Sequence, residues 1–190
     1  LKNGTNGLVP AGTTGESPTL SHKEHEKVIE LCINEVKGKI PIIAGTGSNS
    51  TEEAISLTKH AENVGADGAL VVTPYYNKPT QEGLYQHYKA INDNTSIPII
   101  IYNIPSRCVI DMSVDTMARL FELKNIVGVK DATGDPKRIE QTINKLGNDF
   151  IQLTGEDGFA FDFNKRGGVG IISVTANIAP KLCSDFQRFS

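Results

Sequence analysis

The sequence has few cysteines and no long apolar run. Cys32, Cys108 and Cys183 are odd in number and far apart, and no CxxC pair occurs. This distribution argues against a disulfide framework and a structural zinc site, and it favours a reducing, cytoplasmic setting. The apolar runs have the length of strands, and none approaches the roughly 20 residues that a membrane helix needs.

The excess of one sign of charge over the other is also small. The net charge is −3 over 190 residues, and acidic and basic residues are interspersed. A basic groove for nucleic acid or a basic face for a membrane is therefore not expected. Charged residues make up 22% and apolar ones 38%, as in an ordinary globular chain, and the length fits one domain.

Short apolar runs alternate with helical patterns along the whole chain. Most of the runs are apolar throughout, as expected of parallel strands that are covered on both faces. The first five start roughly 30 residues apart, the length of one strand–helix–strand unit. The seven predicted strands are Gly7–Gly12, Pro41–Gly47, Gly68–Tyr76, Pro98–Pro105, Ile126–Thr133, Ile151–Glu156 and Gly168–Ala176.

The segments between these runs begin with helix-capping residues. Ser21 with Glu24, and Ser50 with Glu53, predict capping boxes, and Asp135 precedes a proline at the first helical position. Two apolar stripes at helical spacing follow the two serines. Their members are Val28, Leu31, Cys32 and Val36 in the first helix, and Ala54, Leu57, Ala61 and Val64 in the second.

Two architectures fit this alternation: a (β/α)₈ barrel that lacks one strand, or an open doubly wound sheet. No GxGxxG motif is present, and polar residues follow nearly every predicted strand instead of gathering at one crevice. This pattern favours the α/β (β/α)₈ TIM barrel, whose site is built from the carboxyl ends of all its strands. We expect residues 1–190 to form a single incomplete barrel domain with the second to eighth strands present.

Lys130 is the strongest candidate for chemistry. In an extended strand Ile126, Gly128 and Lys130 share one face, and Val127 and Val129 share the other. The valines suit the helix-facing side, so Lys130 would point into the barrel, with Gly128 clearing space beneath it. Desolvation there would lower the pKa of the amine and make it available for Schiff-base chemistry. The alternative is a strand-end lysine that reaches out to solvent.

Tyr102 lies in the preceding predicted strand, and Arg107 follows that strand. Tyr102 should also point inward, where its hydroxyl could pass protons, although a core tyrosine with a satisfied hydroxyl would look the same. Arg107 falls in the loop over the barrel mouth and suits a substrate carboxylate, unless it is a rim arginine in solvent.

Two loops could supply further groups. The run Gly12–Ser17 combines hydroxyls with glycines and could form a small anion pocket, or be an ordinary turn. Tyr75 and Tyr76 are adjacent and point opposite ways, so at most one of them reaches the site directly.

Three other patterns are ambiguous. His22 and His25, or Glu156 and Asp157, could bind metal, but neither pair has a third ligand in its pattern. The run Gly167–Gly170 could bind phosphate or allow tight packing before a strand.

Four strings occur in order at a recognisable spacing: Gly12–Ser17, Thr73–Pro79, Tyr102–Arg107 and Gly128–Gly134. On these strings, and along its whole length, the chain resembles the dihydrodipicolinate synthase family of pyruvate-dependent class I aldolases. The resemblance implies condensation of pyruvate with L-aspartate 4-semialdehyde to 4-hydroxy-tetrahydrodipicolinate, the first committed step of lysine and diaminopimelate biosynthesis. It implies no metal or organic cofactor, and a homotetramer built as a dimer of dimers.

The resemblance also implies roles for eight residues. Lys130 forms the imine with pyruvate, and Tyr102 donates and accepts protons. Thr13 and Tyr76 complete the proton relay, Tyr76 coming from a neighbouring subunit. The substrate-binding residues are Thr14 for the pyruvate carboxylate, Arg107 for the semialdehyde carboxylate, and Gly155 and Ile172 along the pyruvate pocket.

Six further residues match positions that bind inhibitory lysine in regulated members of the family: Ser17, His22, His25, Asn49, Glu53 and Tyr75. Pro18 stands where such members often carry alanine, which puts regulation in question. Asp131 stands where many members carry glutamate, a shortening that we expect to be tolerated.

Alternative functions are a sister enzyme, of the N-acetylneuraminate lyase or keto-deoxy-gluconate aldolase type, and a non-catalytic barrel. The sister enzymes share the lysine and tyrosine but generally lack an arginine at the position of Arg107. The family also has a strand before Gly7 and a small helical domain after the barrel. We therefore expect this segment to lack both and, on its own, to be poorly folded and inactive.

Overall fold

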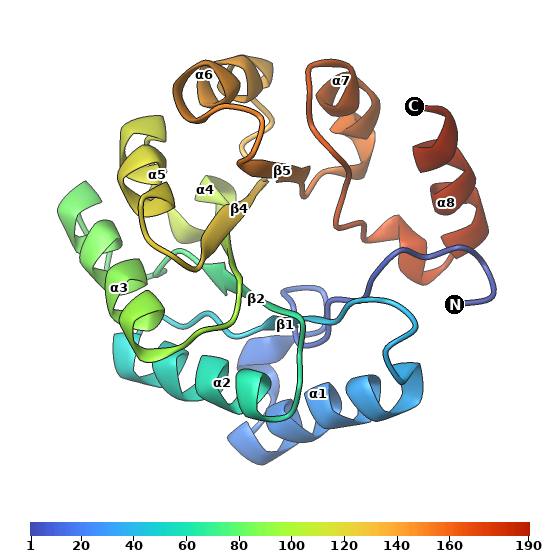
Figure 1. Ribbon diagram of the computed structural model, residues 1–190, viewed down its shortest axis with the longest axis horizontal. Helices are drawn as coiled ribbons and strands as arrows, with labels where there is room; N and C mark the ends of the chain where they lie inside the picture. The colour runs from blue at the N-terminus through green and yellow to red at the C-terminus, as the bar shows by residue number, and fades with distance from the viewer.

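The computed structural model describes residues 1–190 as a curved parallel sheet inside a ring of helices (Figure 1). Five strands pair in chain order: β1 (Ile43–Gly45), β2 (Gly68–Val72), β3 (Ile99–Asn103), β4 (Ile126–Asp131) and β5 (Ile151–Thr154). The α/β barrel prediction is confirmed, with the sheet open between its first and last runs.

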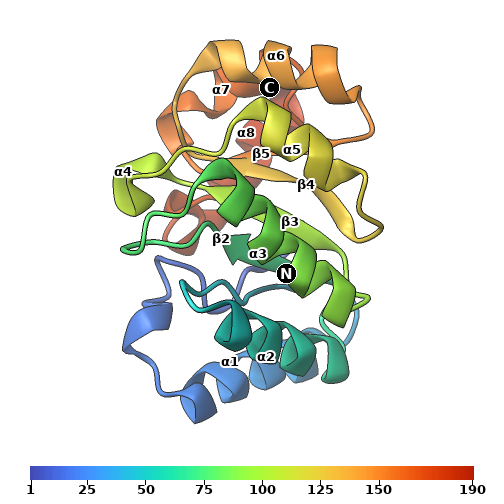
Figure 2. The same cartoon turned by 90° about the vertical axis from the view of Figure 1, so that its left-hand side faces the viewer.

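The helices alternate with the strands and cover the outside of the sheet, as Figure 2 shows from the side. Their bounds are α1 His22–Val36, α2 Thr51–Asn63, α3 Gln81–Asn94, α4 Pro105–Cys108, α5 Val114–Phe121, α6 Pro136–Leu146, α7 Ala160–Lys165 and α8 Pro180–Phe189. Three 3₁₀ turns occur at Ser17–Thr19, Asp157–Phe159 and Thr175–Asn177. No helix is both long and apolar enough to cross a membrane.

The prediction of seven strands was wrong for the first and last runs. Each contributes one isolated parallel bridge, Leu8 with Ile42 and Ile171 with Thr154, beside β1 and β5 respectively. Each run has a single neighbour, and Pro10 has no N–H to extend the first ladder. The other predicted runs were too long because they included the loops that follow each strand.

Two apolar clusters lie on the two sides of the sheet. The outer one fills the space beneath the helices, where the Tyr88 hydroxyl of α3 donates to the Val71 carbonyl at 2.7 Å. The inner one occupies the barrel interior and includes Leu70, Ile100 and Tyr102. Strand alternation therefore sends every second side chain toward the interior, where a site can form.

A β-bulge interrupts this alternation in β4. The register shifts between Ile99 and Ile100, so that these neighbours pair with Ile126 and Gly128 and leave Val127 as the extra residue. Ile126 consequently packs in the outer cluster and Val127 against the inner one, opposite to the prediction from strict alternation. Alternation resumes after the bulge.

The predicted helix starts are largely confirmed. Ser21 and Glu24 form a full capping box, and Asp135 caps α6 through the Lys137 N–H. Ser50 accepts from the Glu53 N–H, but the carboxylate of Glu53 turns elsewhere. The second apolar stripe is essentially correct, with Ala54, Leu57 and Ala61 buried.

The apolar stripe predicted for α1 was correct at Val36, which is buried, and wrong at Leu31. Leu31 is 54% exposed, and Ile29 is completely buried with His25 and Val36. The helix presents these three residues to the barrel because they lie four and seven residues apart. Since a polar histidine occupies one of these positions, the apolar pattern alone pointed to a face that overlaps the buried one only at Val36.

Candidate active site

Lys130 lies inside the barrel, directly opposite Tyr102 of the neighbouring strand. Its Nζ is 4.0 Å from the centroid of the Tyr102 ring, and the residue is only 8% exposed. Burial lowers the pKa of this amine to about 8, while Glu156 and Asp157 partly oppose the shift. A substantial fraction of the amine is therefore neutral near physiological pH and can act as a nucleophile.

Gly155, and not Gly128, makes room for this lysine. A Cβ at Gly155 would lie 2.9 Å from the Cε of Lys130 and 3.1 Å from the Cβ of Ala132. A Cβ at Gly128 would instead meet the Ile151 carbonyl oxygen at 2.3 Å. The space expected beneath Lys130 therefore comes from Gly155, and Gly128 permits the close approach of β5.

Tyr102 is 6% exposed and borders the same interior. Burial raises the pKa of its hydroxyl, whereas contact with the Thr13 hydroxyl and the charge of Arg107 act in the opposite direction. Two residues predicted for the site, Thr13 and Arg107, thus influence one phenol. Ile172 packs against the inner cluster that contains Tyr102.

A cavity of about 410 Å³ opens beside Tyr102. Thr13, Tyr102 and Arg107 line it together with most of the predicted regulatory residues. Those regulatory residues are Ser17, His22, His25, Glu53 and Tyr75. The buried thiol of Cys108 also lines the cavity; its residue type alone gave no signal of this role.

Six predicted residues lie outside the cavity lining: Lys130, Gly155, Ile172, Thr14, Asn49 and Tyr76. Thr14 is in an exposed turn, and Asn49 uses its carbonyl to accept from the Asn77 amide at 3.0 Å. Tyr76 is 89% exposed and has a left-handed φ of 72°. Its side chain therefore does not join Tyr102 within this chain.

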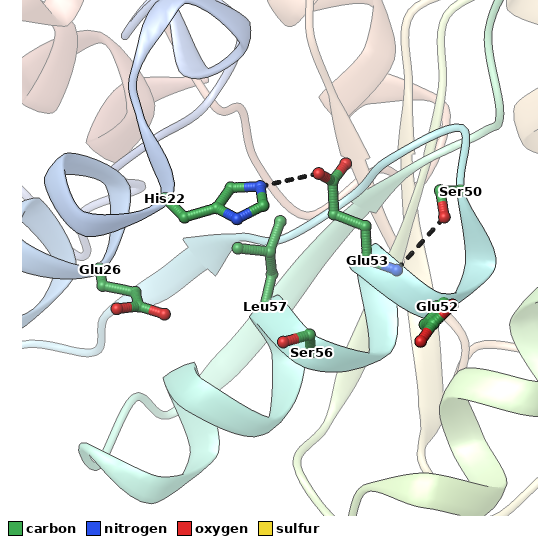
Figure 3. A pocket seen from close by; sticks show the side chains of 7 residues that line it. All are labelled: His22, Glu26, Ser50, Glu52, Glu53, Ser56 and Leu57. Carbon is green, nitrogen blue, oxygen red and sulfur yellow. Dashed lines mark hydrogen bonds and ion pairs between the residues drawn. The ribbon is translucent and has the colours of Figure 1, made fainter.

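His22 and Glu53 meet across α1 and α2, as Figure 3 shows. The His22 Nε2 and Glu53 Oε1 are 2.8 Å apart, and the Ser48 hydroxyl donates to the other oxygen of Glu53. These contacts lower the pKa of the Glu53 carboxyl, Ser48 contributing most. They also explain why Glu53 does not close a capping box with Ser50.

A second groove, of about 250 Å³, adjoins this pair between the two helices. Glu26, Glu52 and Glu53 line it, so it has an acidic character (Figure 3). It shares His22 and Glu53 with the larger cavity, so the two hollows meet at this hydrogen-bonded pair.

The residues considered for metal or phosphate binding have structural contacts within the fold, which favours the interpretation that they serve structure. His25 bonds the Gly45 carbonyl oxygen through Nε2 at 2.8 Å, and burial lowers the pKa of its ring. Asp157 accepts from Ser173 and from the backbone N–H groups of residues 174 and 175. A Cβ at Gly168 would lie 2.0 Å from the Phe163 ring, so this glycine serves packing.

The Lys130 amine is expected to become reactive near pH 8. Below that pH the ammonium form dominates, and above it the free amine does, so the rate of acylation should rise with pH and level off above about 8. Brief acetylation of the complete protein over a pH series, followed by mass mapping, measures this rate. A midpoint near 10.5, the ordinary value for lysine, would contradict the burial argument.

Comparison with known proteins places this geometry in context. The family model described as "Dihydrodipicolinate synthetase family" matches residues 1–189. The 4-hydroxy-tetrahydrodipicolinate synthase of Pelagibacter ubique (strain HTCC1062) is 78% identical over 190 residues. That alignment covers 100% of this chain and 65% of the relative, so the chain spans just under two thirds of that protein's length.

Solved structures agree with the sequence comparison. The chloride-inhibited dihydrodipicolinate synthase of Acinetobacter baumannii, complexed with pyruvate, superposes with a TM-score of 0.96 at 55% identity, covering 98% of this chain and 64% of that one. The enzyme of Cyanidioschyzon merolae with lysine bound superposes with a TM-score of 0.94 at 37% identity, covering 98% and 64%.

Proposed function

The chain belongs to the dihydrodipicolinate synthetase family, and from that premise we propose that Lys130 forms an imine with pyruvate. The observation that carries the proposal is the buried amine of Lys130, with a pKa of about 8, beside Tyr102. The pyruvate in the Acinetobacter baumannii structure supports the choice of substrate.

The reaction then proceeds by amine chemistry. The neutral amine adds to the keto carbon of pyruvate, and water leaves to give the imine. Loss of a methyl proton gives an enamine, whose carbon attacks the aldehyde of L-aspartate 4-semialdehyde. The amine of that substrate displaces Lys130 and closes the ring, which returns the lysine to its starting state.

The other residues predicted for the site have complementary tasks in this proposal. Tyr102 moves protons with the help of Thr13, and Thr14 and Arg107 bind the carboxylates of pyruvate and semialdehyde. Gly155 and Ile172 border the pyruvate. The high exposure of Tyr76 suits a residue that completes the relay in a neighbouring copy, within a homotetramer.

Borohydride trapping tests this proposal. We expect the complete protein, incubated with pyruvate and borohydride, to gain one reduced pyruvate adduct, and peptide mapping to place it on Lys130. Borohydride without pyruvate is the control. No adduct, or a stable adduct on another lysine, would remove the mechanism, and cleavage of sialic acid by the native protein would favour the sister lyase.

We also propose that free lysine binds where the two hollows meet. Glu53 is anionic and, with His22 and Tyr75, lines the cavity, so it can accept an ammonium group. The lysine-bound structure from Cyanidioschyzon merolae supports this assignment.

Calorimetry on the complete protein is expected to show lysine binding that weakens about 10-fold or more in Glu53→Gln, which loses the charge. Glu52→Gln, which changes a neighbouring carboxylate in the groove, is the matched control. Absence of binding at millimolar lysine would end this second proposal without affecting the imine.

A further inference from the structure

The loop that carries Arg107 has a constrained backbone conformation, which contacts with neighbouring elements must stabilise. It runs from the end of β3 to the start of α5 and contains only the four-residue helix α4. Val109 has φ 69° and ψ −34°, a conformation that a β-branched residue adopts only under constraint. Val109 is also 67% exposed, so its own packing does not supply that constraint.

Two neighbouring elements form hydrogen bonds with the end of this loop. Asn103 of β3 donates to the Asp111 carboxylate at 2.7 Å and accepts from the Met112 N–H at 3.1 Å. Gln81 of α3 donates to the Asp111 carbonyl at 2.8 Å and accepts from the Ser113 N–H at 3.0 Å. These contacts fix the loop to β3 and α3, and β3 pairs in turn with β4, the strand of Lys130. A third connection would join the loop to β4 directly.

Arg138 of α6 makes that third connection. Its Nε donates to the Asp131 carboxylate at 3.0 Å, and its two terminal nitrogens donate to the Asp111 carboxylate at 3.2 Å and the Met112 carbonyl at 2.7 Å. The side chains of Arg138 and Asp131 are each only 12% exposed, so solvent screens this pair weakly. Asp131 directly follows Lys130, and its second oxygen accepts from the Thr133 N–H at 2.9 Å.

We infer that Arg138 is a positioning residue, which holds the Arg107 loop at a fixed place relative to the Lys130 strand. The inference rests on the proposed function: Lys130 carries the enamine and Arg107 holds the carboxylate of the aldehyde that the enamine attacks. The guanidinium engages three oxygen atoms on two segments at once. A lysine could satisfy only part of this set because it presents a single nitrogen.

The test compares Arg138→Met with Arg166→Met in the complete protein. Arg166, at the end of α7, pairs with Glu140 of α6 at 2.7 Å but is 43% exposed and touches neither loop nor strand, so it controls for loss of an arginine that contacts α6. In Arg138→Met we expect the KM for aspartate semialdehyde to rise roughly 10- to 100-fold because the loop shifts. The yield of borohydride-trapped pyruvate adduct and the KM for pyruvate should stay at wild-type values. Arg138→Lys should restore part of the semialdehyde KM.

Wild-type protein is measured first, so the two proposals can fail separately. If the wild-type protein forms no pyruvate adduct, both the proposed function and this inference are overturned. An adduct in the wild type, with Arg138→Met behaving like Arg166→Met, overturns the inference alone. So does an equal loss of adduct and semialdehyde use in a folded Arg138→Met protein, because the residue would then serve the fold in general.

Asp111→Asn keeps the test decisive if Arg138→Met does not fold. This change leaves the part-buried Arg138–Asp131 pair intact; it removes the charge on the loop and one of the two oxygens that accept from Asn103 and Arg138. A rise in the semialdehyde KM with an unchanged pyruvate adduct supports the inference. An unchanged semialdehyde KM in Asp111→Asn, with Arg138→Met unfolded, overturns it.

Discussion

Replacing Lys130 by methionine is expected to abolish the pyruvate adduct and to lower turnover about 10³-fold or more. Methionine fills a similar volume but has no nucleophile, and removal of a nucleophile eliminates the covalent route altogether. Steady-state kinetics and borohydride trapping on the complete protein measure both effects. Lys145→Met, at a half-exposed position on α6, is the control and should retain activity.

The same substitution should stabilise the fold. Because the pKa of Lys130 is about 8 in the folded state against an ordinary 10.5, the unfolded chain binds more protons between these values. The free energy of unfolding therefore rises with pH across this window, and below pH 8 the buried ammonium costs roughly 3 kcal/mol. Thermal unfolding of Lys130→Met should show a gain at pH 7 that shrinks as the pH approaches 10. A loss of stability at pH 7 would contradict the desolvation of this lysine.

Replacing Arg107 by alanine is expected to weaken use of aspartate semialdehyde while leaving the pyruvate imine intact. Arg107 lines the cavity near Tyr102 but lies on the exposed loop, away from the amine. Removing one partner of a charged contact costs roughly 2–5 kcal/mol when the other is left unpaired. The measurement is kcat/KM for semialdehyde together with the yield of trapped adduct.

Arg119→Ala serves as the control for Arg107→Ala. Arg119 pairs with Glu82 at 2.9 Å on the outer surface, so its loss should leave both substrates unaffected. Semialdehyde condensation at wild-type efficiency in Arg107→Ala would remove the main discriminator between the synthase and its sister lyases. Loss of the pyruvate adduct in Arg107→Ala would assign the arginine to the first substrate instead.

Much of the fold could be predicted from the order of apolar runs and capping residues. The inward direction of Lys130 was also predictable, because Val129 and Lys130 follow strict alternation. The directions of Ile126 and Val127 could not be predicted. The bulge between them depends on how β4 pairs with β3, and neither apolar run contains a residue pattern that indicates it. Leu31 shows the same limit for helices: its exposure depends on which face of α1 the barrel covers.

The individual residues of the site could be predicted from the sequence, but the contacts among them in space could not. Lys130 and Tyr102 lie near the carboxyl ends of neighbouring strands, Arg107 follows the strand of Tyr102, and the parallel order of the sheet brings these ends together. Arg138 could not be found in this way, because its partners Asp131 and Asp111 lie on separate segments and each residue looks like an ordinary surface charge. Only the folded structure shows that these three charges meet.

Gly128 and Gly155 determine how this barrel can exchange segments with its relatives by recombination. Gly128 lies in β4 but makes room for the Ile151 carbonyl of β5, and Gly155 lies after β5 but makes room for Lys130 of β4. Each glycine is thus matched to an atom encoded on the other side of the helix α6. A gene crossover within that helix gives a working hybrid only when the parent that contributes β4 carries glycine at position 128 and the parent that contributes β5 carries glycine at position 155. A parent with alanine at one of these positions can contribute that segment only together with the segment it is matched to, so that β4 and β5 are inherited as a single block.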